Sequence, residues 1–162
     1  MRIFFIGLPG SGKSTVAKLL AQRLNYKFID MDTAISARED MSINDIFKEK
    51  GEAYFRQVET KVLNSLNEID NVVIACGGGV CLYNPKSSFK GLVIFLKVDV
   101  KVLEGRLVND ETRPLLKKNS IYELALERND KYSQIADLTI ENNKIDETVK
   151  TIVEVLHENF NN

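Results

Sequence analysis

One stretch near the start of the chain constrains its fold more than any other. The residues Gly7-Leu8-Pro9-Gly10-Ser11-Gly12-Lys13-Ser14-Thr15 match the pattern Gly-x-x-x-x-Gly-Lys-[Ser/Thr] of a phosphate-binding loop. The apolar run Ile3–Ile6 precedes the loop, and a segment with helical periodicity follows it. This is the strand–turn–helix context that the pattern requires, although an ordinary glycine turn is the alternative. The stretch predicts a site for a nucleoside triphosphate.

The residue types of this loop suit a bound anion. The glycines let the backbone curl so that successive N–H groups point inward, and the following helix adds its positive N-terminal end. Lys13 would reach the β- and γ-phosphates, and the Ser14 hydroxyl could ligate Mg²⁺. The loop does not say which group receives the phosphate, so the remaining motifs decide the acceptor.

Apolar runs and helical segments alternate along the chain, which predicts a parallel sheet covered by helices. The runs expected to form strands are Arg2–Ile6, Lys27–Ile29, Val72–Ala75, Leu92–Leu96 and Leu138–Ile140. The expected helices follow the glycine loop, begin near Thr33 and at Ser42, follow Gly51, and span about Val100 to Leu107, Ser120 to Ser133 and Ile145 to Phe160. With 162 residues, the chain is expected to form a single domain over 1–162.

Composition excludes several classes of function. A net charge of −1 provides no basic field for nucleic acid, so a small acidic substrate would be held by local arginines. No stretch approaches the roughly 20 apolar residues of a membrane span, and the first apolar run is too short for a signal peptide. Two cysteines, Cys76 and Cys81, do not make a disulfide framework. We expect a cytoplasmic protein with both thiols reduced, serving core packing or, alternatively, sensitive to alkylation.

Three predicted strands end in residues with candidate chemistry, and ligands of open α/β sheets bind at the carboxyl ends of strands. The first strand ends in the phosphate loop, the second in Asp30 and Asp32, and the third in Gly77-Gly78-Gly79. One aspartate could hold Mg²⁺ through water while the other accepts a proton from an attacking hydroxyl; alternatively, Asp32 caps a helix. The glycines allow close approach of a ligand, and their alternative is a flexible turn.

Arginines supply a possible grip on an acid. Arg56 and Glu59 are three residues apart on one helical face, so Glu59 could hold the Arg56 guanidinium for bidentate binding; the alternative is a surface ion pair. Arg113 lies in the polar stretch 109–120, which is either a surface loop or a mobile lid, and could act as an arginine finger. Arg128 lies on the next helix, and both Arg113 and Arg128 have the alternative of a solvated surface charge.

Together these motifs resemble the shikimate kinase family of the nucleoside monophosphate kinase structural group. The resemblance covers Arg2 to about Leu156 and is carried by Phe28-Ile29-Asp30-Met31-Asp32, Ile46-Phe47, Gly51-Glu52-x-x-Phe55-Arg56-x-x-Glu59, Gly77-Gly78-Gly79, Arg113-Pro114-Leu115-Leu116, and Arg128 with Tyr132. It implies a P-loop kinase fold, a three-layer αβα sandwich with a five-stranded parallel sheet in the order 2-3-1-4-5. It also implies the reaction, in which ATP phosphorylates shikimate to shikimate 3-phosphate in aromatic amino-acid and chorismate biosynthesis.

The resemblance also implies roles for individual residues. ATP would be bound by Gly10, Ser11, Gly12, Lys13, Ser14, Thr15, Arg106 and Arg113, and Mg²⁺ by Ser14 and Asp30. Shikimate would be bound by Asp32, Arg56, Glu59, Gly77, Gly78, Gly79 and Arg128, with 33–60 as the substrate-binding region and 109–120 as the lid. The catalytic residues would be Lys13, Asp32 and Arg113. The chain departs from the family pattern at Ser36, at Asp130 and at Asn142-Asn143-Lys144 in the expected adenine loop.

Two rival functions remain at the level of sequence. A gluconate-type kinase would share the loop and the fold, but it would not need Arg56, Glu59 and Arg128 around a triple glycine. A non-catalytic nucleotide-binding homologue would usually lack Lys13, Asp32 or a substrate arginine, all of which are present here. We expect a monomer that binds small molecules and neither nucleic acid nor membranes.

Overall fold

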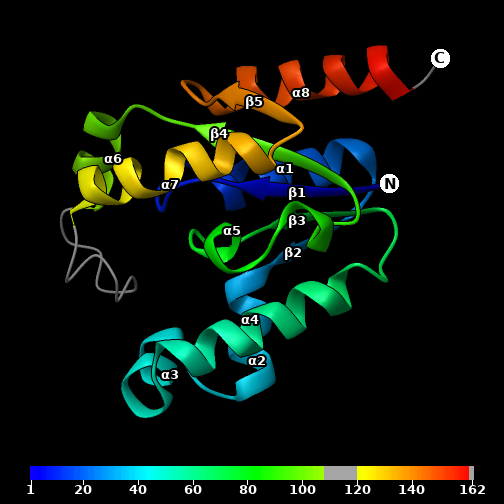
Figure 1. Ribbon diagram of the computed structural model, residues 1–162. Helices are drawn as coiled ribbons and strands as arrows, with labels where there is room; N and C mark the ends of the chain where they lie inside the picture. The colour runs from blue at the N-terminus through cyan, green and yellow to red at the C-terminus, as the bar shows by residue number, and fades with distance from the viewer. Residues whose placement is uncertain (108–119, 161–162) are drawn as a thin grey trace.

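Five parallel strands form the centre of the molecule. The computed structural model describes residues 1–107 and 120–160 of the chain. The strands are β1 (Arg2–Ile6), β2 (Lys27–Asp30), β3 (Val72–Ala75), β4 (Leu92–Lys97) and β5 (Leu138–Glu141). They pair in the order β2-β3-β1-β4-β5, with every pairing parallel. The predicted sheet and its strand order are therefore confirmed (Figure 1).

Helices connect the strands and cover both faces of the sheet. They are α1 (Lys13–Leu24), α2 (Met31–Glu39), α3 (Ile43–Lys50), α4 (Glu52–Leu66), α5 (Val80–Tyr83), the 3₁₀ helix η1 (Lys86–Ser88), α6 (Val100–Leu107), α7 (Ile121–Ile135) and α8 (Ile145–Phe160). Among the described helices, none combines the length and the apolar composition needed to cross a membrane.

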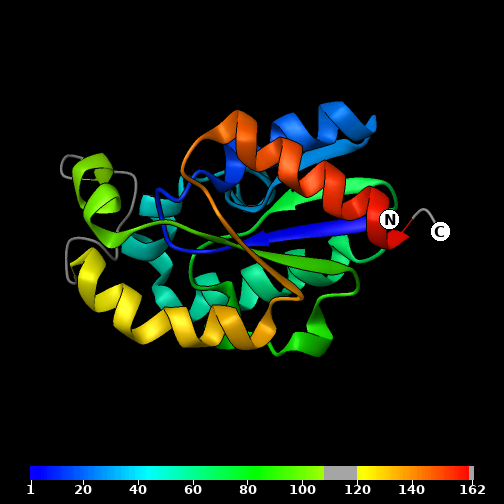
Figure 2. The same ribbon diagram turned by 90° about the horizontal axis from the view of Figure 1, so that it is seen from above.

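The alternation of side chains along β1 explains the three layers. Ile3 and Phe5 point to a core shared with α1 and α8, whereas Phe4 and Ile6 point to a second core shared with α4 and α7. All four side chains are fully buried, because β1 is central and has a helical layer on each face. Figure 2 shows α1 and α8 side by side over the strands, which confirms the predicted αβα sandwich.

The helices α2, α3 and α4 form a cluster beside the edge strand β2 (Figure 1). The Phe47 and Phe55 rings join α3 to α4 with their centroids 4.8 Å apart. The Tyr54 hydroxyl donates a 2.6 Å hydrogen bond to Glu39, which joins α4 to the end of α2. Gly51, at φ +85°, makes the turn from α3 into α4. These contacts hold α4 against the sheet, and α4 carries the candidate substrate residues.

The structure corrects the predicted start of α2. That helix begins at Met31 rather than near Thr33, because the Asp30 side chain caps it by accepting a 3.1 Å hydrogen bond from the Thr33 N–H. The cap is therefore Asp30 and not Asp32. The short helices α5 and η1 were not predicted. The lid predicted at 109–120 lies outside the described residues except for Ser120, whose side chain caps α7.

Candidate functional site

One pocket lies at the carboxyl ends of the central strands. Its wall includes the phosphate loop from Gly10 to Thr15, which follows β1. It also includes Asp30 and Asp32 after β2 and Gly77-Gly78 after β3. Residues predicted from three separate strand ends thus line a single cavity. The parallel arrangement of the strands explains this, since it brings their carboxyl ends to the same edge of the sheet.

Lys13 is folded into the phosphate loop. Its ammonium group donates hydrogen bonds of 2.8 Å to the Gly7 carbonyl and 2.9 Å to the Leu8 carbonyl. The side chain is buried, and the residue still lines the pocket. α1 begins at Lys13, so the positive end of that helix also faces the cavity. The loop therefore presents a buried cation and a helix N-terminus where phosphate oxygens would lie.

Ser14 and Asp30 offer oxygen atoms for a divalent cation. The Ser14 Oγ lies 2.5 Å from Oδ2 of Asp30, and Oδ1 of Asp30 accepts the capping hydrogen bond of α2. Hydroxyl and carboxylate oxygens suit Mg²⁺, which keeps several waters and takes few protein ligands. Within the described ranges, no group of three or more His, Cys, Asp or Glu side chains could hold a metal. The pair therefore fits a Mg²⁺ ion whose other ligands are water and phosphate oxygens.

A cluster of buried charges from α4 and α7 lies against the glycine segment that follows β3. Arg56 Nη1 lies 2.9 Å from Oε1 of Glu59, and the two residues are 7% and 1% exposed. Arg128, from α7, is 3% exposed. Burial raises the pKa of the Glu59 carboxyl, although the charge and hydrogen bond of Arg56 act in the opposite direction. Because both partners are buried, the pair is not the surface ion pair that the sequence left open.

The triple glycine is the surface on which these charged side chains pack. A Cβ on Gly79 would lie 2.5 Å from Nη2 of Arg56, and one on Gly78 would lie 3.0 Å from Nη1 of Arg128. At Gly77 the neighbours are the carboxylates of Glu59 at 3.0 Å and Asp32 at 3.2 Å. None of the three glycines has a positive φ, so the requirement for glycine is steric rather than conformational. The segment is a close-packed floor and not a flexible turn.

Two guanidinium nitrogens in this cluster lack partners. Among the described residues, nothing accepts a hydrogen bond from the buried Nε atoms of Arg56 and Arg128. Buried polar groups of folded proteins are nearly always hydrogen-bonded, so these donors call for a partner that the described residues do not supply. Two arginines with spare donors suit a planar carboxylate. The cluster can therefore bind a small organic acid beside the phosphate loop.

Some residues near the site had no individual role predicted from the sequence. The Tyr132 hydroxyl donates a hydrogen bond to the Gly78 carbonyl and fixes the glycine segment against α7. Its position four residues after Arg128 places both on one helical face, which is a usable signal. The Tyr83 ring lies 4.6 Å from the Arg56 guanidinium carbon. Asn142 contacts Ser11 of the phosphate loop, which lies 131 residues earlier in the sequence, and no local pattern reveals such a contact.

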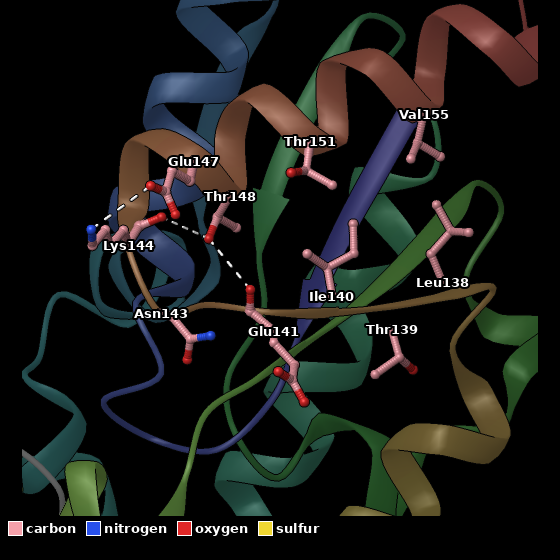
Figure 3. Close-up of a pocket in the computed structure, with 10 residues that line it drawn as sticks. All are labelled: Leu138, Thr139, Ile140, Glu141, Asn143, Lys144, Glu147, Thr148, Thr151 and Val155. Atoms are coloured by element: carbon pink, nitrogen blue, oxygen red, sulfur yellow. Dashed lines mark hydrogen bonds and ion pairs between the residues drawn. The ribbon is translucent and has the colours of Figure 1, made fainter.

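The remaining predicted residues lie at the edge of the pocket or outside the described chain. Arg106 Nη1 donates a 2.9 Å hydrogen bond to the Gly10 carbonyl, so it lies against the phosphate loop. Arg113 is outside the described residues. A separate groove between β5 and α8 is lined by Thr139, Ile140 and Thr151 among others (Figure 3). It contains none of the residues predicted to bind ATP, Mg²⁺ or shikimate, although Asn143 and Lys144 of the expected adenine loop line it.

Known proteins resemble the chain in both sequence and structure. The family model described as shikimate kinase matches residues 9–157. A shikimate kinase of Rippkaea orientalis is 46% identical over 146 residues, which are 86% of this chain and 78% of the relative. A shikimate kinase of Aquifex aeolicus is 42% identical over 159 residues, 94% of each chain.

Solved structures agree with the sequence relatives. The structure of shikimate kinase from Acinetobacter baumannii in complex with shikimate has a TM-score of 0.93 at 32% identity and covers 98% of this chain and 94% of its own. A gluconokinase from Sinorhizobium meliloti 1021 has a TM-score of 0.59 at 18% identity, covering 97% of this chain and 91% of its own. The latter similarity concerns the fold alone.

Proposed function

The chain belongs to the shikimate kinase family, and from that membership we propose that it transfers the γ-phosphoryl group of ATP to shikimate, giving ADP and shikimate 3-phosphate. The enzyme is a phosphotransferase of the shikimate pathway. One observation carries the proposal beyond the family: Arg56 and Arg128 are buried with donors that no described residue pairs, and both lie against the glycine segment, whose Gly77 and Gly78 line the pocket with Asp32 and the phosphate loop. This arrangement places a site for an acid next to a site for a triphosphate.

The acceptor half of the site binds and orients shikimate. Arg56 and Arg128 bind the carboxylate, and Glu59 holds the Arg56 guanidinium in place. Asp32 lies beside Glu59 against Gly77, lines the pocket and accepts a hydrogen bond from the reacting hydroxyl. Because phosphoryl transfer passes through a loose transition state, Asp32 contributes by orienting that hydroxyl at least as much as by removing its proton.

The donor half of the site neutralises phosphate charge. The loop from Gly10 to Thr15 binds the phosphates through backbone N–H groups. The Lys13 ammonium group, which donates to the Gly7 and Leu8 carbonyls, would donate to phosphate oxygens instead. Ser14 and Asp30 would hold Mg²⁺, which supplies charge neutralisation at the β- and γ-phosphates when it is bound. Arg106 contributes from the loop edge, and Arg113, outside the described residues, is the further cation that the family resemblance assigns to the phosphates.

We also infer a cytoplasmic monomer. ATP is a cytoplasmic co-substrate, and both cysteines are buried as free thiols, which suits a reducing compartment. Every side chain that we assign to the acceptor half comes from a single chain, so no second copy is needed to complete it. Light scattering at micromolar concentration tests the monomer, and a mass of twice 18.3 kDa would contradict it.

A substrate panel tests the function directly. The purified enzyme is given Mg-ATP with shikimate, gluconate or a nucleoside monophosphate, and ADP release is measured for each acceptor. We expect ADP release with shikimate alone, because among these acceptors only shikimate combines a ring hydroxyl with the carboxylate that an arginine pair suits. Turnover of gluconate without turnover of shikimate would overturn the proposal.

A further inference from the structure

Asn142 lies immediately after β5 and reaches the phosphate loop near the opposite end of the chain. The residue is 3% exposed, and its side-chain Nδ2 donates a 2.8 Å hydrogen bond to the Ser11 carbonyl. Its own backbone N–H donates a 2.9 Å bond to the Lys97 carbonyl, which continues the β4–β5 pairing by one residue. The amide is therefore held by the sheet and aimed at the loop.

We propose that Asn142 is a positioning residue that sets the orientation of the Ser11–Gly12 peptide for phosphate binding. The proposal rests on the proposed function in that it concerns the ATP site of the same enzyme. It assigns Asn142 to the phosphate loop, and not to the adenine base that its place in the sequence suggests.

Contacts on both sides of the Asn142 side chain fix which way its amide points. The Thr148 hydroxyl lies 2.8 Å from Oδ1 of Asn142 and 2.9 Å from the Lys144 carbonyl, and Thr148 is itself buried in the first turns of α8. Figure 3 shows Thr148 on the inner side of α8 above Glu141. The Ser11 carbonyl can only accept a hydrogen bond, so the amide NH₂ must face it, and Oδ1 is left to accept from the Thr148 hydroxyl. The opposite orientation would bring two acceptors together.

The consequence for the loop follows from peptide geometry. The structure describes no cis peptide bond, and in a trans peptide the C=O and N–H groups point in opposite directions. With the Ser11 carbonyl held by Asn142, the Gly12 N–H is directed away from Asn142. Gly12 lines the phosphate pocket, so that N–H is placed to donate to a phosphate oxygen. Asn142 itself lines the same pocket, and the proposal assigns its effect on the phosphates to the Ser11–Gly12 peptide that it holds.

The close approach of the Asn142 side chain to the loop also explains why position 12 is a glycine. A Cβ on Gly12 would lie 2.6 Å from Nδ2 of Asn142, and the residue has φ +92°, a conformation that favours glycine. Both the packing and the backbone conformation therefore require glycine here. The contact is part of the way the loop is built and not an incidental surface bond.

The first experiment compares two ligands on one variant. Binding of Mg-ATP and of Mg-tripolyphosphate to the wild type and to Asn142→Ala is measured by titration calorimetry, and shikimate binding is measured in parallel. We expect about tenfold weaker binding of both phosphate ligands, the size of one lost hydrogen bond, with shikimate binding unchanged. Equal losses show that Asn142 acts on the phosphates. A loss confined to ATP would assign Asn142 to the base, and unchanged binding of both would leave it without a role; either result overturns the proposal.

A second set of variants tests the proposal even if Asn142→Ala does not fold. Thr148→Val removes the hydroxyl that orients the amide, and Thr148→Ser retains it, so tripolyphosphate binding should weaken in the first and stay within about twofold of wild type in the second. Thr151→Val is the matched control, since Thr151 is exposed one turn along α8 and contacts no loop residue among those described (Figure 3). Equal weakening in Thr148→Val and Thr151→Val would overturn the proposal. Failure of the wild type to phosphorylate shikimate would instead refute the proposed function, because tripolyphosphate binding does not depend on the acceptor.

Discussion

At the scale of single residues, the glycines after β3 act as spacers for the charged side chains of α4 and α7. Gly79→Ala tests this, because a methyl group 2.5 Å from Nη2 of Arg56 would force the guanidinium to move. A shift of about 1 Å in a substrate-positioning group can reduce kcat/KM about 100-fold, so we expect a loss of that order for shikimate with nucleotide binding unchanged. Gly105→Ala is the control, since a Cβ there meets nothing within 4 Å. Normal kcat/KM in Gly79→Ala would show that Arg56 does not bind shikimate from its described position.

Asp32 is the residue whose role is closest to the chemistry. Asp32→Asn keeps the size of the side chain and its place against Gly77, but it removes the negative charge that orients and deprotonates the hydroxyl. We expect kcat to fall about 10² to 10⁴-fold, the range for a group that transfers a proton in the transition state. The dissociation constant for ATP, measured by calorimetry, should stay within about twofold. Near-normal turnover would remove Asp32 from the site.

The two cysteines lie beside the glycine segment but are chemically protected. Burial raises the pKa of the Cys76 thiol well above its usual value and that of the Cys81 thiol to about 12. At pH 8 only about one Cys81 in 10⁴ would be a thiolate, and the thiolate is the reactive form. We therefore expect the native protein not to react detectably with a thiol reagent at pH 8. As the pH rises toward 12, the labelling rate of Cys81 should increase about tenfold per pH unit, in step with its thiolate fraction. The urea-unfolded chain is the reference, because the reagent should label both of its thiols at once. Equally fast labelling of the native protein would contradict the burial of the two thiols.

At the scale of elements, the success of prediction depended on how many residues each kind of pattern needs before it can be recognised. Runs such as Val72–Ala75 and Leu92–Leu96 identified the strands because a buried parallel strand needs nearly every side chain to be apolar. α5 and η1 escaped prediction because four and three residues do not complete a recognisable helical period. The start of α2 was misplaced because Asp30 and Asp32 are both suitable caps, and only the chain path decides that Asp30 accepts from Thr33.

The contacts of the site likewise fall into two groups, those that a local sequence pattern predicts and those that join elements far apart in the chain. Arg56 and Glu59 could be paired from their spacing, since residues three apart face one another on a helix. Sequence spacing could not show that Gly79 lies against Arg56, or that Asn142 reaches Ser11, because those contacts join elements far apart in the chain. What remains hidden in a sequence is therefore the packing between motifs, even where each motif is recognised.

The helix α4 acts as the rigid carrier of the carboxylate clamp. Arg56→Lys retains the positive charge beside Glu59 but loses the planar fork that binds a carboxylate through two hydrogen bonds. We expect KM for shikimate to rise roughly 10 to 100-fold, since hydrogen bonds to charged groups contribute about 1.5–3 kcal/mol, with KM for ATP unchanged. Arg56→Ala is a poorer test, because an unpaired buried Glu59 would destabilise the fold by about 3–5 kcal/mol.

The exposed arginine of α1 supplies the matched control for that clamp. Arg23→Lys makes the same chemical change at a site in the last turn of α1, remote from the pocket. Steady-state kinetics should give wild-type values for this variant. If Arg56→Lys also bound shikimate normally, the clamp would not depend on bidentate geometry, and the assignment of Arg56 would be wrong.

At the scale of the whole molecule, the acceptor half of the site joins side chains from elements that are far apart in the sequence. Arg56 and Glu59 come from α4, Arg128 from α7, and the glycine floor from the segment after β3. The described residues leave the buried Nε donors of Arg56 and Arg128 without a hydrogen-bond acceptor. A bound carboxylate would complete the hydrogen bonding, so substrate should stabilise the folded state as a whole.

Thermal unfolding measures this coupling. At 100 times its Kd, shikimate should add about 2.7 kcal/mol to the free energy of unfolding, since it binds the folded chain only. For a chain of this size that corresponds to a Tm increase of roughly 5 to 10 °C. The methyl ester of shikimate at the same concentration should give a much smaller increase, because it keeps the ring hydroxyls but lacks the anionic carboxylate that the arginines require. Equal shifts with the acid and the ester would mean that the hydroxyls alone account for binding, and the buried arginines would then need another ligand to explain their unpaired donors.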